Sequence, residues 1–170
     1  LQPMLRAAGA TALITDRAHA GRLASAGVRE VAVESIPAAP GTAHDPGIPV
    51  HPESIACVLF TSGSTGGPKG VEMRHGSVFA LVHWLRGHLA PAERASVLAS
   101  SSVGFDVTMA ELWGTLGWGG AVMLVDDVLS APARPVRTAC MVPSVAAELL
   151  RADRLPTGAR TLMLGGEPLP

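Results

Sequence analysis

The stretch Thr61-Ser62-Gly63-Ser64-Thr65-Gly66-Gly67-Pro68-Lys69-Gly70 lies between two segments that have the pattern of β-strands. Its ten residues include four hydroxyl side chains, four glycines and one lysine. Glycine adopts positive φ angles without a Cβ clash, so backbone N–H groups in such a loop can converge on an anion. The hydroxyls add short donors and Lys69 adds a positive charge. The composition therefore predicts a loop that binds the phosphates of a nucleotide.

This stretch differs from the P-loop of nucleoside triphosphatases. In that motif Gly-Lys is followed by Ser or Thr at the start of a helix. Here Pro68 precedes Lys69 and Gly70 follows it, so the magnesium-binding hydroxyl is missing. A flexible Ser/Gly linker is the alternative that this composition allows. The position directly after an apolar run at 55–61, and the ending in Pro-Lys-Gly, favour the phosphate loop.

Around the loop, strand and helix patterns alternate, which indicates an α/β fold with a mostly parallel sheet flanked by helices. Asp16 is a candidate N-cap for an expected helix at 17–26. The apolar run at 55–61 is typical of a strand covered on both faces. The expected strands are 11–15, 28–33, 55–61, 71–74, 96–100, 121–125, 138–142 and 160–164. The expected helices are 3–8, 17–26, 75–88, 108–116 and 143–151.

The composition divides the chain into three parts. Residues 1–36 form a first α/β segment, residues 37–52 a linker rich in proline and glycine, and residues 53–170 the main α/β part. Within the main part, residues 126–137 contain two prolines and separate two expected parallel strands. Such strands need a crossover of about a dozen residues, usually a helix. The two prolines prevent a long helix in this segment. We therefore expect a shortened connection here, which puts the integrity of the sheet in question.

The overall composition excludes several classes of protein. The net charge is −1 and 16% of the residues are charged, without a basic cluster, so we expect no nucleic acid partner. No apolar stretch reaches the length of a membrane helix, so we expect no membrane partner. Cys57 and Cys140 lie in apolar runs, which predicts buried thiols in a reducing compartment and a cytoplasmic protein. Both ends of the sequence have the pattern of a truncated chain.

With Val71, the stretch 61–70 resembles the signature loop of adenylate-forming enzymes. This superfamily contains acyl- and aryl-CoA synthetases, luciferases and the adenylation domains of nonribosomal peptide synthetases. In the family this loop wraps the β- and γ-phosphates of ATP. The resemblance assigns that role to Thr61, Ser62, Gly63, Ser64, Thr65, Gly66 and Lys69. It also implies that the fold is part of the N-terminal core of such an enzyme.

Three further segments resemble the peptide synthetase branch. Residues 72–78 are similar to the segment that follows the loop in adenylation domains, where a histidine, here His75, opens the next helix. Residues 101–113 resemble the Phe-Asp-x-Ser-x-x-Glu-x-[Phe/Trp] motif. Residues 164–167 resemble the Gly-Gly-Glu turn under the adenine, which implies that role for Gly165, Gly166 and Glu167.

Asp106 is the strongest candidate for substrate binding. In amino-acid-activating members of the family, this aspartate pairs with the α-ammonium group of the substrate. A cation in a partly dry pocket needs a carboxylate partner because its desolvation is otherwise uncompensated. The alternative is an acid that stabilises the N-terminus of the helix that follows it. Both roles are compatible with each other.

The same resemblance implies further residues that line the substrate pocket. For three of these residues, Val107, Cys140 and Met163, packing in the protein core is an equally good explanation of their apolar side chains. None of the set carries an acid or a base, which favours a substrate with a neutral side chain, and the small Ala110 suggests a roomy pocket. The implied residues are Val107, Ala110, Cys140, Met163 and Gly165.

We expect no metal site among the histidines of the expected helix 75–88. His75, His83 and His88 are spaced by eight and five residues, whereas a metal pair on one helical face needs a spacing of three or four. We expect His83 and His88 at the surface or half-buried. His75 is expected to cap or orient the phosphate loop.

The resemblance implies an enzyme that forms aminoacyl-AMP from an amino acid, ATP and Mg²⁺, and passes the acyl group to the phosphopantetheine thiol of a carrier protein. The later family motifs, among them Tyr-Gly-x-Thr-Glu, are absent and the chain has no tyrosine, so the catalytic set is incomplete. We therefore expect the chain alone to be inactive. Two alternatives are an acyl- or aryl-CoA ligase fragment, against which Asp106 argues, and a degenerate, non-catalytic interaction module.

Overall fold

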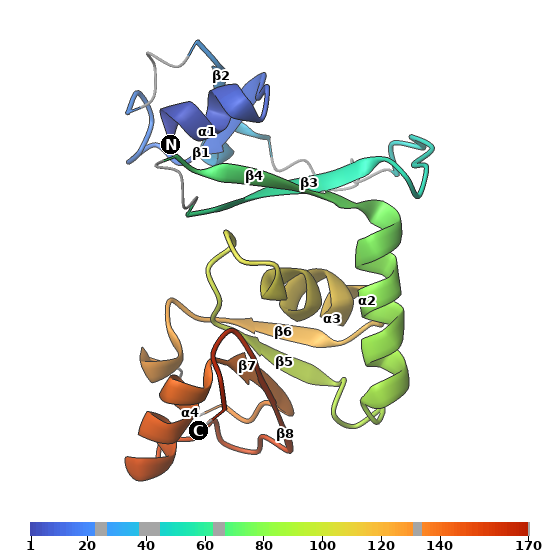
Figure 1. Cartoon of the computed structure of the whole chain (residues 1–170), viewed down its shortest axis with the longest axis vertical. Helices are drawn as coiled ribbons and strands as arrows, with labels where there is room; N and C mark the ends of the chain where they lie inside the picture. Colours follow the sequence, from blue (N-terminus) through green and yellow to red (C-terminus); the bar gives the residue numbers. More distant parts are fainter. Residues whose placement is uncertain (23–26, 38–44, 63–66, 131–133, 170) are drawn as a thin grey trace. The chain divides into compact units, whose positions relative to one another are not determined.

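The computed structural model of the chain describes residues 1–22, 27–37, 45–62, 67–130 and 134–169. The chain separates into two compact units, Leu1–His75 and Gly76–Pro170 (Figure 1). The division by composition into 1–36, 37–52 and 53–170 rests on a different criterion and stays a prediction.

The first part of unit Leu1–His75 contains a small parallel sheet. Helix α1 (Gln2–Ala7) precedes strand β1 (Ala12–Thr15), which pairs in parallel with β2 (Arg29–Ala32). A 3₁₀ turn, η2 (Val33–Ser35), follows β2. The first helix and both strands lie where the sequence predicts them, within two residues at each end.

The predicted helix at 17–26 is wrong for its described part, because residues 17–22 form turns. Carboxylates bind the backbone N–H groups of this segment: Glu34 accepts from Arg17 at 3.2 Å and Glu30 accepts from Gly21 at 2.7 Å. Asp16 accepts from the backbone N–H of His19 at 2.8 Å, so it caps a turn rather than a helix. Residues 23–26 lie outside the described part.

The second part of this unit is an antiparallel hairpin. Strand β3 (Ile55–Thr61) pairs with β4 (Lys69–Arg74), with Thr61 opposite Lys69. The prediction that 55–61 is covered on both faces is wrong: Ile55 is 50% exposed, and among the described residues the strand has one neighbour in its sheet. Cys57 is half-buried rather than buried. A Cβ on Gly70 would lie 3.0 Å from the side chain of Val58, so glycine lets the strands pack closely here.

Unit Gly76–Pro170 contains a four-stranded parallel sheet in the order β6-β5-β7-β8. Helix α2 (His75–His88) leads into it, and its strands are β5 (Ser96–Ala99), β6 (Ala121–Leu124), β7 (Thr138–Met141) and β8 (Thr161–Leu164). Figure 1 shows these strands side by side. The core is built on Leu98, Val136 and Ala139, which are almost completely buried. Helix α2 and these four strands confirm the predicted elements.

The helical segment between β5 and β6 has an unusual winding. Residues Met109–Gly114 form a π-helix, η3, and Thr115–Gly117 continue it as a short α-helix, α3. The sequence predicts an ordinary helix at 108–116. A π-turn inside a helix is rare and is frequently found at functional sites.

The connection from β6 to β7 passes β5 and joins the other side of the sheet. It contains a 3₁₀ turn, η4 (Val128–Ser130), and residues 131–133 lie outside the described part. The predicted absence of a long helix at 126–137 fits the described residues. The sheet continues across this connection, since β7 pairs in parallel with β5 and α4 (Pro143–Arg151) then leads to β8.

Candidate functional site

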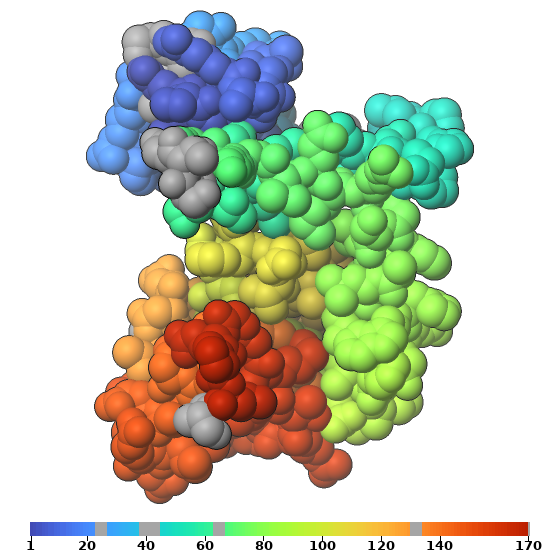
Figure 2. Space-filling model, in the orientation of Figure 1, coloured from blue at the N-terminus to red at the C-terminus, as the bar shows by residue number. Residues whose placement is uncertain are grey.

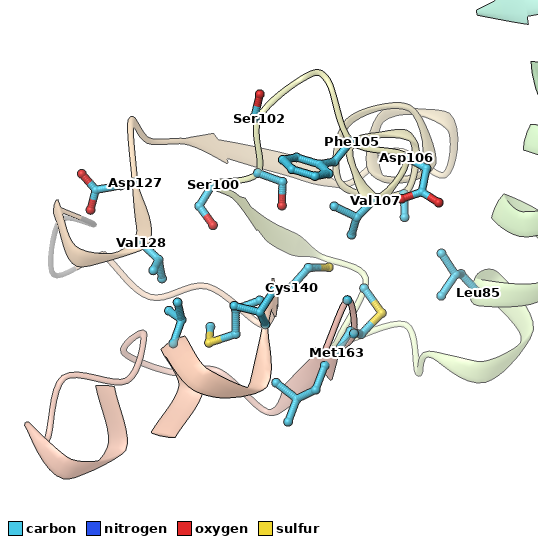
Figure 3. A pocket seen from close by; sticks show the side chains of 18 of the residues that line it. Leu85, Ser100, Ser102, Phe105, Asp106, Val107, Asp127, Val128, Cys140 and Met163 are labelled. Atoms are coloured by element: carbon cyan, nitrogen blue, oxygen red, sulfur yellow. The ribbon is translucent and has the colours of Figure 1, made fainter. Parts of the chain in front are cut away.

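A pocket with a volume of about 660 Å³ lies at the carboxyl ends of the parallel strands (Figure 3). The residues after β5, the end of β7 and the end of β8 form its walls, and Leu81 and Leu85 of α2 add an apolar side. Figure 2 shows, on the face in view, surface formed by α2 in green, by the segment after β5 in yellow and by the end of the chain in red. The other lining residues are Ser100, Ser101, Ser102, Phe105, Asp106, Val107, Ala110, Asp127, Val128, Cys140, Met141, Val142, Val145, Met163, Leu164, Gly165 and Gly166.

The topology of the sheet explains the place of the pocket. The chain leaves β5 toward β6 on one side and returns to β7 on the other side. In open α/β sheets, ligands bind outside the carboxyl ends of the strands where the strand order reverses. The pocket lies where this general rule expects a ligand.

The six residues predicted to bind the substrate all line this pocket: Asp106, Val107, Ala110, Cys140, Met163 and Gly165. They come from different places in the chain, and Figure 3 shows Asp106 and Val107 across the pocket from Cys140 and Met163. Cys140 and Ala110 are almost fully buried, at 2% and 7% exposure, so they also belong to the core. The structure thus brings these residues together, and their contact with a substrate stays a prediction.

The carboxylate of Asp106 forms no hydrogen bond or ion pair with another residue in the described part of the chain. Asp106 is exposed and lies just before the helical segment that leads into η3. Its backbone carbonyl accepts from the N–H of Met109 at 2.9 Å. A carboxylate at the rim of an apolar pocket, with no partner in the described part of the chain, is available to a cationic ligand.

Glu111 does not line the pocket, but it binds Ser101, which does. The motif quoted for 101–113 contains Glu111 without implying a role for it. Its side chain is completely buried on η3. The carboxylate accepts from the hydroxyl of Ser101 at 2.9 Å and from the N–H of Ser101 at 3.3 Å. Burial raises the pKa of Glu111 above its usual value, although the hydrogen bonds from Ser101 oppose this.

The thiol of Cys140 lies in the same apolar surroundings. Burial, with a smaller contribution from the negative charge of Glu111, raises the pKa of Cys140 to about 12. The thiol is therefore protonated at neutral pH, and a thiol is a weaker nucleophile than a thiolate. Cys140 forms part of the pocket wall.

The turn after β8 holds the second predicted group, Gly165, Gly166 and Glu167. Both glycines line the pocket, whereas Glu167 is absent from its lining. The carboxylate of Glu167 accepts from the N–H of Ser144 at 3.1 Å and from its hydroxyl at 3.0 Å, so it caps the first turn of α4. Gly166 has a φ of 85°, a value that favours glycine.

The predicted phosphate loop is described at its two ends. Thr61 and Lys69 face each other at the ends of β3 and β4, and Ser62 follows Thr61. All three residues are exposed. Lys69 makes no ion pair with a described residue. The remaining loop residues Gly63, Ser64, Thr65 and Gly66 lie outside the described part.

The three histidines of α2 are exposed. His83 stacks on Phe79 with ring centroids 6.0 Å apart, and His88 lies 4.2 Å from the ring of Trp84. The backbone N–H of His75 donates to Ser54. Among the described residues, no group of three or more His, Cys, Asp or Glu side chains is arranged to hold a metal. No helix in the described part has the length and apolar character that crossing a membrane requires.

Known proteins match the sequence over most of its length. AMB antimetabolite synthetase AmbB of Pseudomonas aeruginosa is 46% identical over 128 residues, which are 73% of this chain and 10% of the relative. A linear gramicidin synthase of Brevibacillus parabrevis is 42% identical over 123 residues, 70% of the chain and 2% of the relative. Phosphinothricin tripeptide synthetase PhsC of Streptomyces viridochromogenes is 37% identical, covering 98% of the chain and 16% of the relative. The chain thus spans a small part of these curated relatives.

Solved structures match the fold. O-succinylbenzoate coenzyme A synthetase (MenE) from Bacillus subtilis, in complex with ATP and magnesium ion, has a TM-score of 0.80 at 24% identity and matches 99% of this chain and 37% of that one. VinN in complex with L-aspartate has a TM-score of 0.76 at 22% identity, with 99% and 47% covered. At these identities the likeness shows the fold, which is part of the adenylate-forming α/β fold that the sequence predicts.

A family model for AMP-binding enzymes matches residues 1–170, the whole chain. This match confirms the resemblance drawn from the loop at 61–70. The chain belongs to the family of AMP-binding enzymes.

Proposed function

We propose that this chain is the amino-acid-binding and part of the ATP-binding region of an adenylation domain. In the complete enzyme, a carboxylate oxygen of the amino acid attacks the α-phosphorus of ATP, and the bond to pyrophosphate breaks. The products are aminoacyl-AMP and pyrophosphate. The observation that carries the proposal is the Asp106 carboxylate, which has no partner among the described residues and lines an apolar pocket at the carboxyl ends of the sheet.

The proposed role of Asp106 is to bind the α-ammonium group of the substrate. This pairing fixes one end of the amino acid, so its side chain extends into the pocket. Val107, Ala110, Cys140, Met163 and Gly165 offer that side chain an apolar surface. The surroundings favour a neutral side chain, since a charged one would lose hydration without a partner among these five residues.

The proposed role of the 61–70 loop is to hold the phosphates of ATP. Thr61 and Lys69 are paired at the end of β3 and the start of β4, so the hydroxyl and the ammonium group can approach one anion. Gly165, Gly166 and Glu167 are proposed to form the turn on the adenine side. We propose that Mg²⁺ binds together with ATP and offsets the negative charge of its phosphates. The chain offers no cluster of three metal-binding side chains among its described residues.

The proposal extends to the biological setting of the complete enzyme. The curated relatives are named as synthetases of peptides and an antimetabolite. We propose a carrier protein with a phosphopantetheine thiol as the acceptor of the aminoacyl group, and a cytoplasmic role in secondary metabolism. Residues 1–36 are proposed as a preceding subdomain, 37–52 as a linker and 53–170 as the incomplete core.

ATP–pyrophosphate exchange by the full-length protein tests the proposal. Exchange that depends on an amino acid, and that is weak with fatty or aromatic acids lacking an amine, supports it. Exchange that prefers acids without an amine would reassign the chain to a CoA ligase. An absence of exchange with all substrates, together with an absence of ATP binding, would favour a non-catalytic module.

A further inference from the structure

The loop that carries Asp106 has little support from packing. It runs from Ser101, after β5, to Thr108, at the start of the helical segment. Val103 and Phe105 in its middle are 73% and 65% exposed. The shape of such a loop depends on how its two ends are held.

Hydrogen bonds hold the base of this loop. The hydroxyl of Thr108 donates to the carbonyl oxygen of Ser102 at 2.9 Å, and the N–H of Phe105 donates to the same oxygen at 3.0 Å. Glu111, on η3 just beyond the loop, binds Ser101 with both carboxylate oxygens. Ser101 is thus tied through its side chain and its backbone to one buried residue.

The burial of Glu111 argues for a role beyond stability. A buried carboxylate loses its hydration, and the hydrogen bonds that it accepts inside the protein must offset this loss. What the carboxylate provides is a fixed geometry, because two donors on one serine specify its position. Ala110, the neighbour of Glu111 on the π-helix, lines the pocket. The same turn of η3 therefore faces the pocket and holds the loop.

We propose that Glu111 is a positioning residue that binds Ser101 and thereby holds loop 101–108 with Asp106 at the pocket. The inference rests on the proposed function, in which Asp106 receives the α-ammonium group. Glu111 acts through the loop and has no contact with the reacting atoms. It sets the affinity for the amino acid and leaves the phosphate-binding loop unaffected.

Glu111→Gln in the full-length protein is the first test. Glutamine keeps the shape, but its amide nitrogen cannot accept from Ser101, so one of the two bonds is lost. We expect the KM for the amino acid in ATP–pyrophosphate exchange to rise about tenfold, and the KM for ATP to change by less than about twofold. Ser101→Ala, which removes the hydroxyl, is expected to act in the same direction with a smaller effect. The double variant is expected to be no worse than Glu111→Gln.

Glu148→Gln is the matched control, because Glu148 is an exposed glutamate on α4 that pairs with Arg151 at 3.2 Å. It is expected to leave both KM values unchanged. A purely structural role for Glu111 would lower the thermal midpoint in both Glu111→Gln and Ser101→Ala without changing the KM for the amino acid, and this result would overturn the inference. Wild-type protein without amino-acid-dependent exchange would overturn the proposed function itself. Active wild type with unchanged variants would overturn the positioning role alone.

Discussion

One glutamate lies at each end of the parallel sheet, and the two differ in burial and in their hydrogen-bond partners. Glu93, at the amino end, accepts from the hydroxyl of Thr161 at 2.5 Å and from the N–H of Ala90 at 2.6 Å. Its backbone carbonyl accepts from the hydroxyl of Thr138 at 3.0 Å. Glu111, at the carboxyl end, is completely buried and binds Ser101.

The hydrogen-bond partners of the two glutamates lie on different kinds of element. Thr138 and Thr161 are the first residues of β7 and β8, so Glu93 fastens strands to one another. Ser101 belongs to the loop that carries Asp106, so Glu111 fastens a wall of the pocket. We therefore expect the amino end to contribute mainly to the stability of the fold, and the carboxyl end to contribute to the proposed site. Variants at the amino end should change unfolding, and variants at the carboxyl end should change substrate binding.

A pair of glycines gives the largest expected contrast in stability. A Cβ on Gly120, just before β6, would lie 2.4 Å from the carbonyl oxygen of Arg94. Backbone cannot move aside easily, so we expect Gly120→Ala to lower the free energy of unfolding by about 1–3 kcal/mol. Gly165, after β8, has no atom within 4 Å of an added Cβ. Gly165→Ala should leave the unfolding free energy within about 0.5 kcal/mol of wild type.

Urea unfolding of both variants checks the stability part of this contrast, and exchange assays check the binding part. Because Gly165 lines the pocket, its extra methyl group should change the relative KM values of large and small amino acids. An equal loss of stability in both variants would contradict the expectation that the amino end of the sheet determines stability and the carboxyl end determines substrate binding.

A smaller effect is expected at Glu93 and depends on pH. The hydrogen bond from Thr161 and the backbone N–H of Ala90 hold the pKa of Glu93 below its ordinary value of 4.5. A carboxyl with a depressed pKa stabilises the fold above the pKa of the unfolded chain, and this stabilisation is lost as the pH falls through the folded pKa. Glu93→Gln should therefore lower the thermal midpoint at pH 7, and the difference from wild type should shrink in acid.

Thermal unfolding from neutral pH down to below the ordinary pKa of a glutamate measures this difference. The KM for the amino acid should stay at its wild-type value, unlike that of Glu111→Gln. A midpoint difference that is constant over the whole range would show that the charge of Glu93 plays no part.

The sequence predicts the parallel sheet well because its strands are set by local patterns. Strands β5, β6, β7 and β8 lie in short apolar runs, and each lies within a residue or two of its expected range. The lining of the pocket by the six predicted residues also follows from the sheet, since residues that follow parallel strands gather at one edge.

The errors have causes that lie far away in the sequence. The helix at 17–26 is replaced, in its described part, by turns because Glu30 and Glu34 bind backbone N–H groups of that segment. The run at 55–61 has an apolar pattern, but the number of its neighbours in the sheet is a property of the whole fold. A buried role for Glu111 could not be predicted from its own position, because its partner Ser101 is ten residues away on another element.

The most direct test of the central claim compares an amino acid that supports exchange with the same acid lacking the amine. Wild type should prefer the amino acid strongly, because Asp106 compensates the ammonium charge in the pocket. In Asp106→Asn the value of kcat/KM for the amino acid should fall about 100-fold, whereas the value for the amine-free acid should change little. If Asp106→Asn kept the wild-type preference for the amine, the pocket at the carboxyl ends of the sheet would not bind the amino acid through Asp106.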